Sequence, residues 1–345
     1  MAEVLRFWLR RGVDGFRVDA SAVLIEDDLL RDDPCDPEAG PDTPPPQRLK
    51  RIFTDDRAES MECLEELRAV IDEFDDRVLA GEVQGKLDRI GHFYAGERPR
   101  FHLPLNFILL DTPWDALSLQ ASVDAYIKAI PRDAWPCWVI GGHDKQRIAS
   151  KIGQAGARLM AMLLLTLRGT PFLFAGDELG MEQAPVEAGR IDDPFEKLVP
   201  GHGLNRDPER APMRWDDGPH GGFSTAEPWL RQDQPERNVA RLKRDNRSIL
   251  QLWRHLIDLR KRQPVLTEGD YEPVRARNDV FAFRRRLGNE SILVLLNLAP
   301  DPRRWIAEEP GRLLLSSHLD RDKDVALDGS ITLRANEGLI VKVGG

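Results

Sequence analysis

The chain has 345 residues, 41% hydrophobic and 31% charged, which suits one large globular domain with a smaller one. Its net charge of −9 argues against nucleic acid or an anionic membrane as a partner. Its three cysteines are odd in number and unpatterned, so neither a disulfide framework nor a metal cluster is expected. With no evident leader and no apolar stretch of membrane-spanning length, we expect a cytoplasmic protein.

Helices and strands alternate through the first three quarters of the chain. Hydrophobic spacing predicts helices at residues 2–11, 61–74, 117–130, from 148 onward and 248–262. Short apolar runs predict strands at 14–19, 77–82, 101–106, 137–142 and 171–176, with long polar loops at 27–57 and about 180–246. Strands separated by crossover helices indicate a parallel sheet.

The pattern changes after about residue 266. Short strands separated by turn residues follow, at DVFAFRRRL, SILVLLNLA, GRLLLSS, SITLRA and GLIVKV. This spacing predicts an antiparallel β domain. We therefore expect an α/β catalytic domain at 1–265 and an all-β C-terminal domain at 266–345.

An arginine and an aspartate interrupt the first predicted strand. In GVDGFRVDA, residues 12–20, Arg17 and Asp19 lie two residues apart and therefore on one face of the strand. Burying such a pair is costly unless the pair is functional or richly hydrogen-bonded.

Three carboxylates end predicted strands in the same way: Asp19 after FRV, Glu82 after VLAG and Asp144 after VIGGH. The C-terminal ends of parallel strands form the rim on which α/β barrels carry their reactive groups. Glycosidic bond cleavage needs two carboxyl groups there, one to attack or stabilise the sugar carbon and one to protonate the leaving oxygen. Taken singly, each of the three is more often a turn former or helix cap.

Several short motifs help to decide whether these three carboxylates are catalytic or structural. GFRVDA, LAGEV and GGHDKQR resemble three conserved motifs of the α-amylase superfamily of glycoside hydrolases. The resemblance extends over nearly the whole chain and is closest to the bacterial α-glucosidase and oligo-1,6-glucosidase branch. The further strings are HLPLNF, AWPCWVIGGHDKQRIASKIG, LLLTLRGTPFLFAGDELGM, DPFEK, NRDPERAPMRWD and GFS.

The resemblance implies a role for each of these residues. Asp19 would be the nucleophile that forms a covalent glycosyl-enzyme intermediate, and Glu82 the general acid and then the general base. Arg17 would hold Asp19 ionised and oriented. Asp144, with His143, would bind hydroxyls of the glucose ring, and Arg147 would contact the same acids. Trp138 could stack on sugar, but its position in a strand favours the core.

The chain departs from the family pattern in two places. Gly142 stands where the family has an asparagine, which removes a supporting amide. Three N-terminal βα units and an inserted subdomain of the family have no counterpart in this sequence. The expected fold is therefore a partial TIM barrel of about strands four to eight, followed by a C-terminal antiparallel β-sandwich. We expect such a truncated chain to be poorly active or inactive alone, since open barrel edges leave backbone groups unpaired.

The expected activity is retaining hydrolysis of terminal α-glucosidic bonds in short α-glucosides, without cofactor or metal. Relatives with Ala or Thr after the nucleophile tend towards α-1,4 linkages, so Ala20 favours maltose-like or sucrose-like substrates. One alternative is a transglycosylase or isomerase of the trehalose synthase or sucrose isomerase type. The others are an inactive, sugar-binding fragment and a non-catalytic relative of transporter heavy chains, which this chain resembles less because it retains the acids. The oligomeric state is left open.

Overall fold

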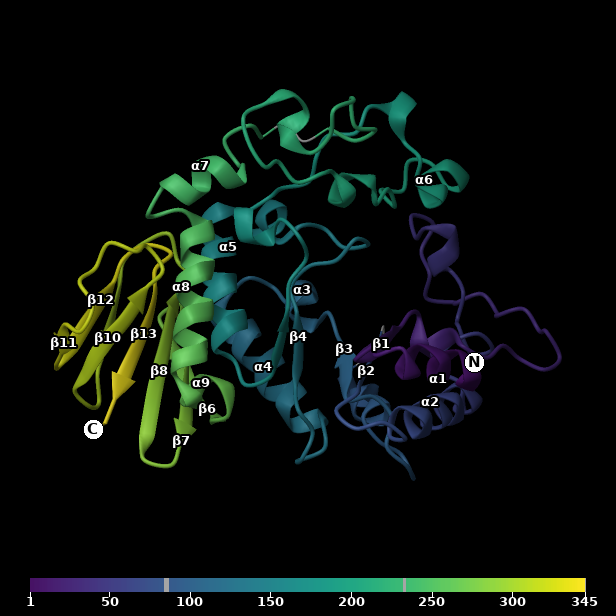
Figure 1. Cartoon of the computed structure of the whole chain (residues 1–345), viewed down its shortest axis with the longest axis horizontal. Coiled ribbons are helices and arrows are strands. Elements are labelled where there is room, and N and C mark those ends of the chain that lie inside the picture. Colours follow the sequence, from purple (N-terminus) through teal and green to yellow (C-terminus); the bar gives the residue numbers. More distant parts are fainter. Residues whose placement is uncertain (84–86, 232–233, 345) are drawn as a thin grey trace. The chain divides into compact units, whose positions relative to one another are not determined.

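A computed structural model describes residues 1–83, 87–231 and 234–344, and the chain folds into two compact units (Figure 1). The first unit contains Met1–Phe107, Ala125–Trp138 and Leu198–Leu204. The second contains Ile108–Asp124, Val139–Lys197 and Asn205–Gly345. The domain boundary expected at residue 265 stays a prediction.

The first unit is built on a parallel sheet, as the alternation of helices and strands predicts. Strands β1 (Gly15–Val18), β2 (Val78–Glu82) and β3 (Leu103–Leu105) lie in the order β1-β2-β3. Val18 of β1 lies opposite Gly81 of β2, so the two strands end side by side. Helices α1 (Ala2–Arg10) and α2 (Ala58–Ile71) pack against each other in this unit.

Most predicted elements between the strands are confirmed, with shifted ends. The remaining helices are α3 (Ile108–Asp111), α4 (Ala116–Ala129), α5 (Ile148–Thr166), α6 (Pro194–Leu198), α7 (Val239–Arg244), α8 (Ile249–Arg262) and α9 (Pro264–Thr267). Strand β4 (Cys137–Val139) ends in the second unit and pairs there with β5 (Thr170–Phe172). Strand β3 covers only Leu103–Leu105 of the strand predicted at 101–106, and helix α3 follows at Ile108.

Short 3₁₀ helices lie in the loops. They span Ser21–Val23, Pro45–Gln47, Leu87–Phe93, Asp177–Leu179, Ala188–Arg190, Asp207–Arg210 and Pro219–Gly222.

Helix α5 forms the centre of the second unit. By length and composition alone it could cross a membrane, whereas no apolar stretch of membrane-spanning length is expected from the sequence. Most of the helix is buried inside the unit, as core helices are, and Gly153 interrupts it with a φ of 72°. Helix α8 packs along α5, and the Ser248 hydroxyl caps its N-terminus by accepting a hydrogen bond from the Gln251 N–H.

The C-terminal part of the second unit is antiparallel, as predicted. A six-stranded sheet has the order β11-β10-β13-β8-β7-β6, and β12 and β9 form a second, two-stranded sheet. The strands are β6 (Asp270–Arg277), β7 (Val280–Leu287), β8 (Glu290–Asn297), β9 (Arg303–Ile306), β10 (Gly311–Ser316), β11 (Ala326–Leu327), β12 (Ser330–Leu333) and β13 (Gly338–Val343). Strands β6, β9 and β11 were not predicted, because charged residues or short length hide their alternation.

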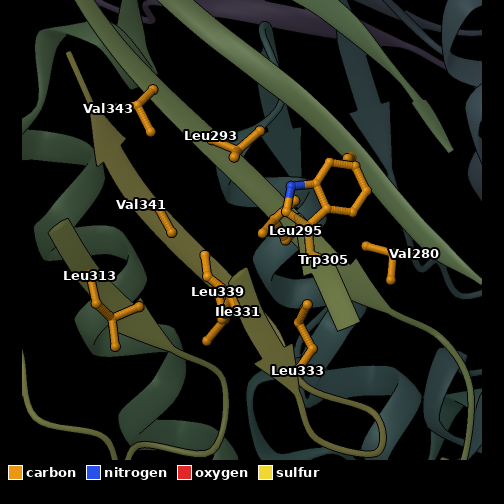
Figure 2. Packing of buried hydrophobic residues seen from close by; sticks show 11 residues of the cluster. Val280, Leu293, Leu295, Trp305, Leu313, Ile331, Leu333, Leu339, Val341 and Val343 are labelled. Carbon is orange, nitrogen blue, oxygen red and sulfur yellow. The ribbon is translucent and has the colours of Figure 1, made fainter. Parts of the chain in front are cut away.

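Side chains of both sheets form one buried core. Trp305 of β9 and Ile331 of β12 pack with residues of the large sheet such as Leu295 and Val341 (Figure 2). The alternation of strand side chains sends Val280 and Ala282 of β7 into this core.

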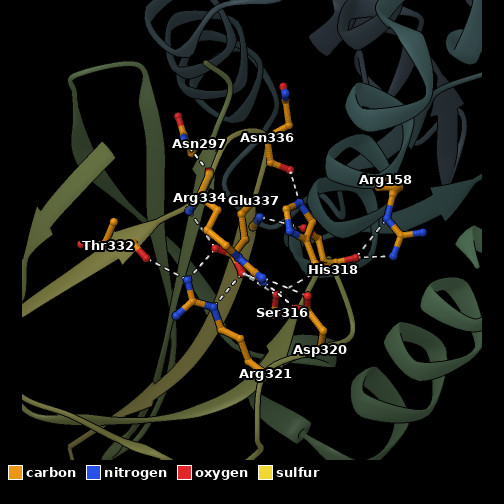
Figure 3. Close-up of polar contacts among 12 residues, drawn as sticks. Arg158, Asn297, Ser316, His318, Asp320, Arg321, Thr332, Arg334, Asn336 and Glu337 are labelled. Carbon is orange, nitrogen blue, oxygen red and sulfur yellow. Dashed lines mark hydrogen bonds and ion pairs between the residues drawn. The ribbon is translucent and has the colours of Figure 1, made fainter. Parts of the chain in front are cut away.

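Buried arginines join this sheet to the helices of the same unit. The guanidinium of Arg285, on the opposite face of β7, donates to the carbonyls of Thr166, Leu266 and Gly269 at 2.6–2.9 Å. Thr166 ends α5, so the cation also lies at the negative end of a helix dipole. From α5, Arg158 donates through Nε to the Ser317 carbonyl at 3.0 Å (Figure 3).

Candidate active site

One guanidinium joins the two carboxylates at the ends of β1 and β2. Arg17 Nη1 lies 2.9 Å from Asp19 Oδ1, and Nη2 donates to Glu82 Oε2 at 2.6 Å. Asp19 directly follows β1 and Glu82 is the last residue of β2, so parallel pairing brings both to the same edge of the sheet. Arg17 and Asp19 are thus part of a three-residue cluster, in which Arg17 makes an ion pair with Asp19 and a charge-assisted hydrogen bond to Glu82.

The two carboxylates differ sharply in their surroundings. The side chain of Asp19 is 76% exposed, whereas that of Glu82 is 8% exposed. Retaining glycosidases need two carboxyl groups about 5–5.5 Å apart, one able to reach the sugar carbon. The ion pairs to the two sides of one guanidinium place both acids beside the same cation at one edge of the sheet.

A sharp turn after Asp19 fixes the end of β1. Ala20 adopts a left-handed conformation, with φ 45° and ψ 46°, which is costly for a residue other than glycine. The next residue, Ser21, is fully buried and its hydroxyl donates to the backbone carbonyl of Glu82. The turn therefore ties the two strand ends together.

The residue before Glu82 must be glycine. A Cβ atom on Gly81 would lie 2.0 Å from Cζ of Phe101, whose ring packs over this point of β2. Phe101 is 1% exposed, so its ring is enclosed by the fold at this point. The position of Glu82 is thus set by the close packing of the Phe101 ring on Gly81 as well as by the ion pair with Arg17.

In the second unit, Asp144 is held by two arginines. Arg210 Nη2 donates to Asp144 Oδ1 at 2.7 Å and Arg206 Nη1 to the same oxygen at 3.0 Å. His143 Nε2 is 3.4 Å from Oδ2, and the carbonyl of His143 accepts a hydrogen bond from Arg210 Nε. The predicted pair His143 and Asp144 is therefore together and partly accessible.

Arg147 is buried, and its hydrogen-bond partners are other groups of the same unit. Its Nη1 donates to the Ala175 carbonyl at 2.7 Å and its Nη2 to the Glu209 carbonyl at 2.8 Å. Its guanidinium also stacks on Phe174 and lies 3.6 Å from Asp177 Oδ1. Asp177 is itself buried, and this burial raises its pKa to about 7. This placement favours a structural role for Arg147, holding loops of its unit together, over the predicted contact with sugar or with Asp144.

Trp138 belongs to the core, as its strand position indicates. It is fully buried and packs edge-on against Tyr126, with 4.7 Å between the ring centroids.

Sequence reasoning missed Arg206, Arg210 and the buried carboxylate of Asp193. All three lie in the long polar loop predicted at about 180–246. The motifs DPFEK and NRDPER carry these residues, but nothing in their spacing shows that they return to Asp144.

One group among the described residues offers three potential metal ligands. His318, Asp320 and Glu337 lie close together in segments that follow β10 and precede β13 (Figure 3). The Glu337 carboxylate is already paired with Arg321 and Arg334, and Asp320 is paired with Arg334. These arginines supply the positive charge that a cation would bring, so the residues do not favour a metal.

The chain is similar in sequence and fold to known proteins. Residues 1–269 match the family described as "Alpha amylase, catalytic domain". A probable alpha-glucosidase of Rhizobium meliloti (strain 1021) is 34% identical over 318 residues, which are 86% of this chain and 57% of that protein. Maltase A1 of Drosophila melanogaster is 32% identical over 86% of this chain and 56% of its own length.

A solved structure, that of the alpha-glucosyl transfer enzyme XgtA, is similar over 99% of this chain and 66% of its own. Its TM-score is 0.87 and its sequence identity 29%. The chain thus spans little more than half the length of the curated relatives that it matches.

Proposed function

Because the chain belongs to the α-amylase family, we propose that it is a retaining glycoside hydrolase that cleaves terminal α-glucosidic bonds of short α-glucosides. Its fold is that of the family, a TIM barrel with a C-terminal antiparallel sheet domain. The observation that carries the proposal is the attachment of Asp19 and Glu82 to the two sides of the Arg17 guanidinium.

The proposed reaction is a double displacement. Asp19 attacks the anomeric carbon while the protonated carboxyl of Glu82 gives its proton to the departing oxygen, and a glycosyl ester with Asp19 forms. Glu82, now a carboxylate, takes a proton from water, which attacks the same carbon and releases Asp19. Net inversion at each step returns the original anomeric configuration.

The remaining predicted residues act on the sugar and on the nucleophile. Arg17 keeps Asp19 ionised and turned towards the bond to be cleaved. His143 and Asp144 bind hydroxyls of the transferred glucose. Ala20 favours α-1,4-linked substrates of the maltose or sucrose type, although a methyl-sized difference contributes only about 1–3 kcal/mol to such discrimination.

We propose in addition that the barrel of this chain is partial, with about strands four to eight. The support is the coverage of the relatives, 57% of the Rhizobium protein and 66% of XgtA. We infer that such a partial barrel is poorly active or inactive alone, since open barrel edges leave backbone groups unpaired. A cytoplasmic location stays a prediction.

Glucosyl transfer is the second candidate, since XgtA is an alpha-glucosyl transfer enzyme. Hydrolysis is preferred because both curated relatives described above are named for glucosidase activity. The two differ only in whether water or a sugar hydroxyl attacks the glycosyl ester.

The test is hydrolysis of p-nitrophenyl α-glucoside followed by NMR of the released sugar. We expect α-glucose as the first product. Release of β-glucose first would contradict a retaining mechanism, and a disaccharide product would assign transfer instead. A chain that neither turns over nor binds α-glucosides would contradict the proposed function.

A further inference from the structure

Arg206 is held by a carboxylate that has no contact with solvent. Its backbone N–H, Nε and Nη2 donate to Asp193 at 2.6, 2.8 and 2.8 Å. The Asp193 side chain is 0% exposed. Three of the donors of Arg206 are therefore committed to one buried partner, which fixes the direction of the remaining Nη1.

An aromatic ring fixes the plane of the same guanidinium. Arg206 stacks on Phe195, with its central carbon 4.6 Å from the ring centroid. The N–H of Phe195 itself donates to Asp193 Oδ1 at 3.1 Å, so ring and guanidinium share one anchor. A stacked, bidentate arginine is a rigid donor that lysine cannot reproduce.

The free end of this rigid guanidinium reaches Asp144. Arg206 Nη1 and Arg210 Nη2 both donate to Oδ1 of Asp144. Among the described residues, the polar group facing Oδ2 is His143 Nε2, at 3.4 Å. Oδ1 of Asp144 thus accepts hydrogen bonds from two arginines, whereas Oδ2 can accept a hydrogen bond from a further donor.

We propose that Arg206, locked by Asp193, is a positioning residue that occupies Oδ1 of Asp144 and so presents Oδ2 to a sugar hydroxyl. This inference rests on the proposed role of Asp144 in binding the glucose ring. Asp193 contributes through Arg206, without contacting sugar. The Arg206 hydrogen bonds hold the pKa of Asp193 well below its ordinary range, so the anchor stays charged at neutral pH.

The kinetic test uses Asp193→Asn, Arg206→Lys and the double variant, with p-nitrophenyl α-glucoside as substrate. We expect each single variant to lower kcat/KM about 10-fold, mainly through KM, because the ring-binding carboxylate loses its fixed orientation. The double variant should be no worse than Arg206→Lys alone, because Asp193 acts through Arg206. Additive losses would overturn the proposal.

The matched control is Asp320→Asn. Asp320 also holds an arginine, Arg334, at 2.9 Å, but in the C-terminal sheet. Because Asp320 is more exposed than Asp193, the control should lower the melting temperature less than Asp193→Asn, and it should leave KM unchanged. If KM increased equally in the control, the KM increase in Asp193→Asn would reflect lower stability alone, and the proposal would be overturned.

A second readout does not depend on turnover. Hydrogen–deuterium exchange of the peptide 142–147, which contains the Lys145 N–H bonded to the Gly142 carbonyl, reports the loop that carries Asp144. Exchange should accelerate in Asp193→Asn and in Arg206→Lys but not in Asp320→Asn. Unchanged exchange in the first two variants would overturn the positioning role, whereas absence of wild-type turnover would count against the proposed function alone.

Discussion

The hydroxyl of Ser21 donates a hydrogen bond to the backbone carbonyl of Glu82. Ser21 is fully buried and lies two residues after Asp19, so this bond joins the end of the first strand to the end of the second. The spacing of the two proposed catalytic carboxylates therefore depends on a side chain that touches neither of them.

Ser21→Ala tests this connection. Loss of one buried hydrogen bond should lower the free energy of unfolding by about 1 kcal/mol and reduce kcat, because the turn that carries Asp19 loosens. Urea unfolding and steady-state kinetics measure the two effects. Ser224→Ala, which removes a half-buried loop hydroxyl that accepts a local hydrogen bond from the Ala226 N–H, serves as the control. Unchanged kcat in Ser21→Ala would show that the turn holds without this bond.

Replacing the carboxylates separates their proposed roles. Asp19→Asn should abolish turnover of every α-glucoside, since no glycosyl ester can form. Glu82→Gln should lower kcat/KM for maltose by about 10²–10⁴-fold, but less for p-nitrophenyl α-glucoside, whose leaving group departs without a proton. Asp14→Asn is the control: the Asp14 side chain lies just before β1 and is 92% exposed, so this variant should leave activity unchanged. Equal losses of Glu82→Gln on both substrates would argue against its role as the acid.

Gly81→Ala should force apart β2 and the ring of Phe101, because its Cβ would lie 2.0 Å from a ring carbon. Overpacking of this kind costs about 1–3 kcal/mol and should also displace Glu82. Urea unfolding of Gly81→Ala and of Gly40→Ala, where a Cβ meets nothing within 4 Å, gives the comparison. Equal stability of the two variants would mean that Phe101 moves aside.

Asp177 makes stability depend on pH. Burial raises its pKa from 3.8 to about 7, against the opposing effects of the Phe174 N–H and the Arg147 charge, while the nearby Glu178 adds to the increase. Between these two values the folded state holds a proton that the unfolded chain has released. The contribution of Asp177 to the free energy of unfolding therefore decreases as pH rises from about 4 to about 7.

Asp177→Asn should flatten this part of the pH profile, whereas Asp328→Asn, at an exposed position, should not. Urea unfolding at about pH 5 and about pH 8 measures the difference. A profile of Asp177→Asn parallel to that of the wild-type protein would contradict the buried, protonated state of this carboxyl.

Much of the fold could be predicted because its elements have strong periodic patterns. The parallel strands at Asp19 and Glu82 and the long helix from Ile148 follow from apolar spacing alone. Strand β6 was missed because DYEPVRAR carries a proline and charges, which an edge strand tolerates. The extended run predicted at 101–106 shortens to β3 because helix α3 begins at Ile108.

Some residues of the candidate site could likewise be predicted from the sequence, and others could not. Asp19, Glu82 and Asp144 stand out because each acid ends an apolar strand, and Arg17 because it shares a face with Asp19. The partners of Asp144 could not be predicted, since Arg206 and Arg210 return to it from a loop more than sixty residues along the chain. Arg147 shows the converse: its place in a motif suggests contact with substrate, while burial against backbone carbonyls directs it to a structural role.

The central claim is that Asp19 becomes covalently attached to glucose. The most direct measurement is mass spectrometry of peptides after long incubation of the chain with 5-fluoro-α-glucosyl fluoride, a reagent that traps the ester and needs only one slow turnover. We predict a fluoroglucosyl adduct on the peptide that contains Asp19, absent in Asp19→Asn. An adduct on a different carboxylate, or a wild-type chain left unlabelled, would contradict the assignment.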